Sequence, residues 1–184
     1  ASDVYKRQIQ DAMNSHEHKT FLLHGVTGSG KTQLYLRATA RCISQDKTAI
    51  ILVPEIILTD QIVKRFVETF GDEVVVFHSK LTVQQRNNNW ERLRRKDSHI
   101  IIGARSAVFA PAEDIGLIVV DEEHDPSYKQ EDMVRYHARN VALWRAEAHG
   151  CPVILGSATP SVTSYYKAKQ GEYHLLELPH RIFE

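Results

Sequence analysis

The sequence predicts an α/β domain: a mostly parallel central sheet with helices on both faces. Short apolar runs rich in β-branched residues alternate with amphipathic stretches along the chain. A glycine-rich loop joins the first clear apolar run to a helix-like segment, and acidic residues directly follow a later run. In open parallel sheets such loops and acids meet at the edge where the strands end, which is where ligands bind.

The expected strands are short apolar runs, and turn residues separate most of them from the expected helices. In chain order the strands are Thr20–His24, Ala49–Val53, Val74–Phe77, His99–Ile102, Leu117–Asp121, Val153–Leu155 and a last one near Tyr173–Leu178. The expected helices are Lys31–Ser44, Thr59–Phe70, Val83–Arg95, His137–His149 and Ser161–Lys169. Turns are marked by Asp46-Lys47, Gly71-Asp72, Gly150-Cys151-Pro152 and Gly171.

The two ends of the chain are expected to be cut from a longer protein. Residues 1–8 fit no cap or strand pattern, and we expect that they are not part of the native fold. Residues 1–15 are therefore treated as an N-terminal segment of uncertain structure. We expect one domain over residues 16–184, because 184 residues suffice for one well-buried core.

Composition narrows the function classes. Apolar residues make up 42% and charged residues 25%, as in an ordinary globular protein, and the net charge is zero with His neutral. A nucleic-acid partner therefore has to be argued from local patches. Cys42 and Cys151 have no metal-ligand spacing and are expected to be buried thiols. With no membrane-spanning run and no leader, we expect a cytoplasmic protein without a membrane partner.

The stretch from Gly25 to Thr32 is the most informative motif. It follows Phe21-Leu22-Leu23 and precedes a helix-like segment, which is the order that a phosphate-binding P-loop requires. Lys31 is expected to reach the β- and γ-phosphates of a nucleotide, and the Thr32 hydroxyl to ligate Mg²⁺. The alternative is a chance glycine turn before a surface helix. The residues expected to hold phosphate are Gly25, Val26, Thr27, Gly28, Ser29, Gly30, Lys31 and Thr32.

A second candidate site follows the strand that contains Ile118-Val119-Val120. An acid at that position completes the Mg²⁺ shell in P-loop hydrolases, and the next acid can activate the attacking water. We therefore assign Asp121 to the metal and Glu122 to the water. One alternative is a solvated acidic turn. Another is a metal site made of Glu122, Glu123, His124 and Asp125. It is disfavoured because adjacent side chains at a strand end point in different directions.

The segment Gly156–Pro160 follows another apolar strand. Its hydroxyls, on Ser157 and Thr159, can bridge the acidic site to a neighbouring lobe. The alternative is a polar turn that caps the helix from Ser161.

Together these motifs resemble superfamily 2 helicases, the DExH-type motors built on RecA-like lobes, and among them the bacterial primosomal replication-restart helicases. The resemblance covers nearly everything from Phe21 onward. It rests on Gly25–Thr32, Val53–Ile56 with Leu58-Thr59, His78-Ser79, Gly103–Ala107 with Phe109, Asp121–His124, Ser127–Gln130, Arg135–Arg139 and Gly156–Pro160.

The resemblance implies a RecA-like P-loop NTPase domain with ATP and Mg²⁺ as cofactors. Lys31, Asp121 and Glu122 are then catalytic, with Thr32 and Asp121 on the metal. His124, with Ser157 and Thr159, is expected to couple the ATP site to motion.

The resemblance also implies residues that contact single-stranded DNA. The segment Ser127–Arg139 matches an aromatic-rich loop that senses DNA in this family, and two strand-end loops match those that hold the DNA backbone. The expected contacts are Thr59, Arg105, Ser106, Tyr128, Lys129, Arg135, Tyr136 and Arg139. Arg105 has a structural alternative, and Trp90 and Trp144 fall on helical faces that favour packing.

The implied function is the first lobe of an ATP-dependent 3′-to-5′ DNA helicase in replication restart and primosome assembly. Expected partners are single-stranded and forked DNA, primosome proteins and single-strand-binding proteins. A second lobe, a zinc region and an N-terminal DNA-binding domain are expected outside this chain. Without the second lobe's arginine finger, the chain is expected to bind nucleotide and hydrolyse it slowly. Two alternatives stay open: another superfamily 2 translocase, or a nucleotide-dependent switch without motor activity.

Overall fold

A seven-stranded, all-parallel sheet forms the centre of the computed structural model, which describes residues 2–55 and 61–181. The strand order is β3-β4-β2-β5-β8-β1-β9. The strands are β1 (Thr20–Gly25), β2 (Thr48–Leu52), β3 (Val74–Phe77), β4 (Ile100–Gly103), β5 (Ile115–Val120), β8 (Val153–Ser157) and β9 (His174–Leu178). The expected fold class and all the expected strands are therefore confirmed.

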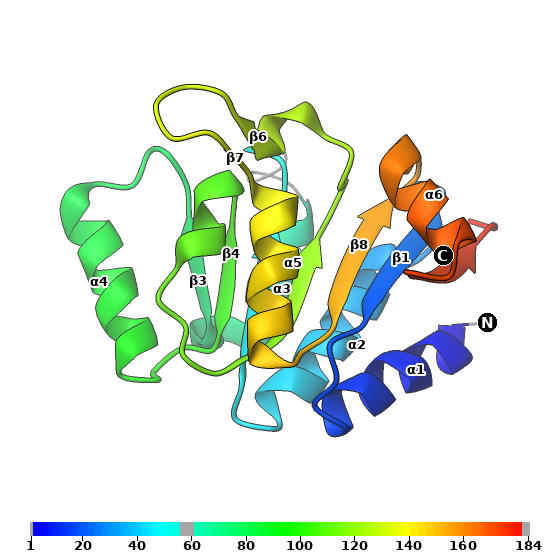
Figure 1. Ribbon diagram of the computed structural model, residues 1–184. Coiled ribbons are helices and arrows are strands. Elements are labelled where there is room, and N and C mark those ends of the chain that lie inside the picture. The colour runs from blue at the N-terminus through cyan, green and yellow to red at the C-terminus, as the bar shows by residue number, and fades with distance from the viewer. Residues whose placement is uncertain (1, 56–60, 182–184) are drawn as a thin grey trace.

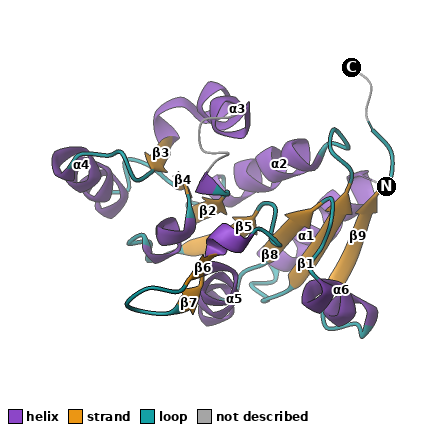
Figure 2. Ribbon diagram, turned by 90° about the horizontal axis from the view of Figure 1, so that it is seen from above, coloured by secondary structure: helices purple, strands orange, loops and turns teal. Residues whose placement is uncertain are grey.

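Helices cover both faces of this sheet, as Figures 1 and 2 show. They are α1 (Ser2–Asn14), α2 (Lys31–Ile43), α3 (Gln61–Phe70), α4 (Val83–Arg94), α5 (Ala138–His149) and α6 (Val162–Lys169). Because side chains alternate along a strand, each strand supplies both cores. Ile51 packs with the side chains of α1 to α3 on one face, whereas Ile50 packs with those of α4 to α6 on the other.

Two elements were not expected from the sequence. Helix α1 packs on α2 and buries Ile9, Ala12 and Met13, so the segment left unassigned contributes to one core. A hairpin of β6 (Lys129–Gln130) and β7 (Tyr136–His137) lies beyond the carboxyl end of β5 (Figure 1). Its two-residue strands are too short to show a periodicity in the sequence.

The carboxyl ends of the central strands lie side by side. Leu52 of β2 is level with Val120 of β5, Val120 with Leu155 of β8, and Leu155 with Leu22 of β1. The loops that leave these strands therefore share one edge, as expected. Thr59, a predicted DNA contact, lies outside the described residues. No helix in the described ranges is long and apolar enough to cross a membrane.

Candidate active site

The glycine loop after β1 has the backbone of an anion site. Gly30 precedes α2 with a φ of 92°, a left-handed conformation that favours glycine, and no side chain caps the helix. The first N–H groups of α2 therefore remain available to an anion. Ser29 Oγ is buried without a hydrogen-bond partner among the described residues. Lys31 is also buried, and its Nζ donates to Gly25 O at 2.7 Å.

Asp121 immediately follows β5 and is bound to the helix that begins at this loop. Tyr35 lies one helical turn after Lys31 on α2, and its hydroxyl donates to Asp121 Oδ1 at 2.8 Å. Burial raises the pKa of Asp121 to about 6, although the Tyr35 bond and the Lys31 charge both act to lower it. Lys31 therefore lies close enough to Asp121 for its charge to act on that carboxyl, in surroundings that disfavour an uncompensated carboxylate.

Gly156 of β8 makes room for the Tyr35 hydroxyl. A Cβ at this position would lie 1.7 Å from Tyr35 Oη and 3.4 Å from Asp121 Oδ1. Only glycine therefore allows the close approach that places Tyr35 against Asp121.

Replacing Gly156 with Ala should displace Tyr35 and destabilise the fold by about 1–3 kcal/mol, because the added methyl overpacks a buried site. Urea denaturation measures this loss. The Gly156→Ala change should cost less when it is made in a Tyr35→Phe background, since the closest atom is then absent. Equal costs in both backgrounds would contradict the packing assigned to Tyr35.

Glu122 lies between two residues whose positions are held. It has a φ of 46°, which is unusual for a residue other than glycine. On one side, the Tyr128 hydroxyl donates to Asp121 O at 2.6 Å; on the other, Glu123 N–H donates to Gly156 O at 3.0 Å. These bonds fix the backbone on both sides of the half-buried Glu122, at the strand edge next to Asp121.

His124, Ser157 and Thr159 come together, as their predicted coupling role requires. His124 Nδ1 is 2.7 Å from Ser157 Oγ and 3.7 Å from Glu122 Oε2. Thr159 N–H donates to Ser157 Oγ at 2.9 Å, and Thr159 Oγ1 is 3.4 Å from His124 Nε2. The acidic segment and the segment after β8 are therefore connected by side chains.

Tyr128 requires a correction, because it is fully buried and offers no face to a DNA base in this structure. Burial raises the pKa of its hydroxyl well above the ordinary value, which keeps it a donor to Asp121 O. Arg105 Nη1 donates to Ser127 O at 3.2 Å and Lys129 O at 2.8 Å, the two carbonyls that flank Tyr128. The structural alternative for Arg105 thus applies here, with carbonyls rather than an acid as partners.

Arg139 requires a similar correction, because it is an ion-pair partner and not an open phosphate contact. Its Nη1 lies 2.7 Å from Glu123 Oε2, and Glu123 is fully buried. Glu123 also accepts from Ser161 N–H at 2.6 Å and Ser164 Oγ at 2.9 Å. Sequence reasoning missed this cluster, since nothing in the spacing of an acid, an arginine and two serines links them.

The other predicted DNA contacts lie on the surface beside the hairpin. Ser106, Lys129 and Arg135 are exposed and Tyr136 is half-buried. Lys129 Nζ is paired with Glu131 at 2.6 Å. A hollow of about 470 Å³ is lined by Arg105, Ser106, Tyr136 and neighbouring residues. Three of the predicted DNA contacts therefore line one hollow, and Lys129 and Arg135 line another that shares Tyr136 with it.

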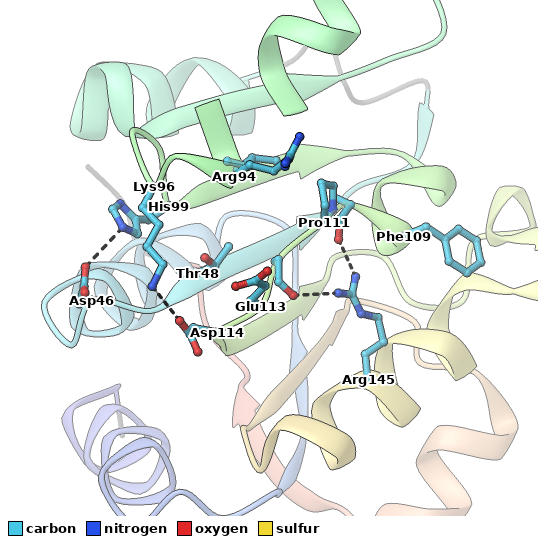
Figure 3. A pocket seen from close by; sticks show the side chains of 13 residues that line it. Asp46, Thr48, Arg94, Lys96, His99, Phe109, Pro111, Glu113, Asp114 and Arg145 are labelled. Atoms are coloured by element: carbon cyan, nitrogen blue, oxygen red, sulfur yellow. Dashed lines mark hydrogen bonds and ion pairs between the residues drawn. The ribbon is translucent and has the colours of Figure 1, made fainter. Parts of the chain in front are cut away.

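A different pocket, of about 320 Å³, lies where strands begin (Figure 3). Several of its charged groups already have partners within the fold. Lys96 Nζ is 2.9 Å from Asp114 Oδ2, and Arg145 Nη1 donates to Ala110 O at 3.0 Å. Because it lies at the amino ends of β2, β4 and β5, we do not assign it to the active site.

No cluster of three or more His, Cys, Asp or Glu side chains that could hold a metal ion is found within residues 2–55 and 61–181. Of the two predicted metal ligands, Thr32 and Asp121, only Asp121 is of a residue type counted in such clusters. Asp121 is the buried acid of the pair, and Thr32 is half-buried at the start of α2.

Comparisons with known proteins identify the family of this chain. A family model described as DEAD/DEAH box helicase matches residues 5–167. The chain is 53% identical over 174 residues to replication restart protein PriA of Bacillus subtilis, which covers 95% of this chain and 22% of that relative. It is 45% identical over 178 residues to PriA of Treponema pallidum, and this match covers 96% of this chain and 27% of that relative. The chain thus spans about a quarter of the length of these relatives.

Solved structures of helicases share the fold. RecG bound to a three-way DNA junction matches with a TM-score of 0.71 and 21% identity, over 99% of this chain and 24% of that one. The helicase domain of Pyrococcus furiosus Hef matches with a TM-score of 0.63 and 18% identity, over 95% and 37%. These matches identify a RecA-like helicase fold.

Proposed function

Because the chain belongs to the DEAD/DEAH box helicase family, we propose that it is the ATP-binding lobe of an ATP-dependent 3′-to-5′ DNA helicase. The identity to replication restart protein PriA supports a role in replication restart, and we extend the proposal to primosome assembly and to a location in the cytoplasm. The observation that carries the proposal is the bond from Tyr35 to Asp121, because it joins the phosphate loop to the acidic strand end in one site.

The residues of this site fit a magnesium nucleotide. The uncapped start of α2, the buried Ser29 hydroxyl without a partner and Lys31 suit the phosphates. Thr32 and Asp121 would hold Mg²⁺, and the raised pKa of Asp121 is that of a carboxylate which a cation would stabilise. When bound, the metal would neutralise charge that develops on the phosphate oxygens.

Glu122 is the group proposed to act on the attacking water. Its backbone lies at the strand edge next to Asp121, between two residues whose backbone groups are hydrogen-bonded. From there the carboxylate can accept a hydrogen bond from a water molecule and take up a proton as charge develops. His124 Nδ1 lies 3.7 Å from Glu122 Oε2 and 2.7 Å from Ser157 Oγ. This position between the two residues supports the coupling role proposed for His124.

Single-stranded and forked DNA are the proposed partners, and primosome and single-strand-binding proteins are expected with them. Ser106, Lys129 and Arg135 provide exposed polar or charged groups, and Tyr136 a partly exposed ring. Arg105 supports communication with the ATP site, because it holds the carbonyls on both sides of Tyr128, and Tyr128 holds Asp121. A phosphate that competes for Arg105 would release this connection.

Linked binding of nucleotide and DNA tests the proposed function. The affinity for a fluorescent ATP analogue with Mg²⁺ is measured with and without an oligothymidylate, and the affinity for DNA with and without nucleotide. Each ligand should change the affinity for the other by the same factor. Independent binding, or no binding of either ligand, would contradict the proposal.

Lys31→Ala should weaken binding of the magnesium nucleotide by about 10- to 150-fold, because a charged hydrogen bond contributes about 1.5–3 kcal/mol. Titration of the fluorescent analogue measures the loss. Lys64→Ala, an exposed lysine on α3 outside the loop, is the control and should leave affinity unchanged. If both variants bind nucleotide as the parent does, Lys31 does not contact the phosphates.

A further inference from the structure

A second hollow opens next to the predicted DNA contacts, between α4 and the 3₁₀ turn Arg105–Phe109. Its volume is about 250 Å³. Its lining includes Trp90 and Arg86 from α4, Phe109 from the turn, and His78 after β3. His78, Arg86 and Ser106 also line the 470 Å³ hollow, so the two hollows adjoin each other.

The walls of this hollow include two aromatic rings that the fold leaves open. Trp90 is 44% exposed and Phe109 is 54% exposed, although large aromatic side chains gain most when they are buried. Phe109 also contacts Tyr136 of the hairpin edge to face, with ring centroids 4.9 Å apart. The aromatic surface therefore runs from α4 toward the hairpin.

The charge around the rings favours a nucleic acid over an apolar peptide. No carboxylate is among the described residues that line the 250 Å³ hollow. In the adjoining 470 Å³ hollow the charged lining residues are Arg86, Arg105 and Glu55, so arginines outnumber carboxylates there. Aromatic faces beside a basic groove are what single-stranded nucleic acid uses, because every base has a face to stack and every linkage a phosphate.

We propose that this hollow is a base-stacking subsite for single-stranded DNA, with Trp90 and Phe109 stacking on a base and Arg86 contacting the adjoining phosphate. With this subsite, the proposed path of the single-stranded DNA continues from Ser106 toward α4. The proposal rests on the proposed function, and it reassigns Trp90, for which the helical pattern favoured packing.

The two tryptophans of the chain allow a direct test. Trp144→Phe leaves Trp90 as the only reporter, and Trp90→Phe leaves Trp144, an exposed residue on α5, as the matched control. Each variant is titrated with an oligothymidylate of about 12 nucleotides. Tryptophan emission and the anisotropy of a labelled oligonucleotide are both followed. Emission should be quenched on binding when Trp90 is the reporter, and should not change when Trp144 is.

Affinity provides the second readout. Trp90→Ala and Arg86→Ala should each weaken binding about tenfold, whereas Trp144→Ala should not. DNA binding by anisotropy with unchanged Trp90 emission overturns the subsite and leaves the proposed function standing. No binding by any variant, the Trp144→Phe chain included, overturns both. Because that chain keeps the hollow intact, misfolding of Trp90→Ala does not obscure the result.

Discussion

Glu122→Gln should lower ATP turnover about 10²- to 10⁴-fold, because the amide can no longer take a proton from the attacking water. The change is isosteric and keeps the backbone bonds of Asp121 and Glu123 that flank the position. Nucleotide affinity should therefore remain within about twofold of the parent. Single-turnover hydrolysis with saturating DNA measures the rate, and titration with a fluorescent analogue measures the affinity.

The control for this variant is Glu68→Gln, which removes an exposed carboxylate on α3. It should hydrolyse ATP as the parent does. A nucleotide-dependent switch without motor activity predicts little change in either variant. Equal rates for the parent and Glu122→Gln would therefore favour the switch and sink the assignment of Glu122 to the water.

Arg139→Met should reduce the free energy of unfolding by about 3 kcal/mol, since it leaves the buried Glu123 carboxylate without its cation. Methionine keeps much of the side-chain volume, so the loss reports charge more than packing. Urea denaturation at neutral pH measures it. Arg135→Met, an exposed arginine in the loop between β6 and β7, is the control and should cost less than about 0.5 kcal/mol.

Acid should narrow the difference between the parent and Arg139→Met. Burial acts to raise the pKa of Glu123, but the bonds from Ser161, Arg139 and Ser164 outweigh it and lower that pKa below 4.5. The stability from this carboxylate is therefore complete above pH 4.5 and is lost as pH falls through the lowered value. A constant difference between the two proteins from pH 7 to pH 3 would mean that the ion pair contributes nothing.

The sheet and the phosphate loop could be predicted because their signals are local. Each strand is a short apolar run, and the loop from Gly25 to Thr32 needs particular residues at fixed positions. Helix α1 carried a usable signal, since Tyr5, Ile9, Ala12 and Met13 recur at helical spacing and face the core. That signal was missed because residues 1–8 carry no cap pattern.

The roles of Tyr128 and Arg139 could not be predicted in the same way. A tyrosine in a polar loop and an arginine near a helix start both read as surface residues. Their burial depends on Asp121 and Glu123, which only the folded sheet edge brings to them. The proposed site residues nevertheless cluster at one edge, because parallel strands end together there.

The left-handed backbone at Glu122 lowers the stability of the fold at a position whose side chain is proposed to act in catalysis. Glycine, or less fully asparagine, would relax this peptide by about 1 kcal/mol and remove the carboxylate in the same step. A laboratory selection of random variants for heat resistance alone should therefore enrich such changes at position 122. The selected variants would be more stable to heat but would lack the carboxylate proposed to act on the attacking water. Residue 122 should therefore be kept unchanged when the protein is engineered for thermal stability.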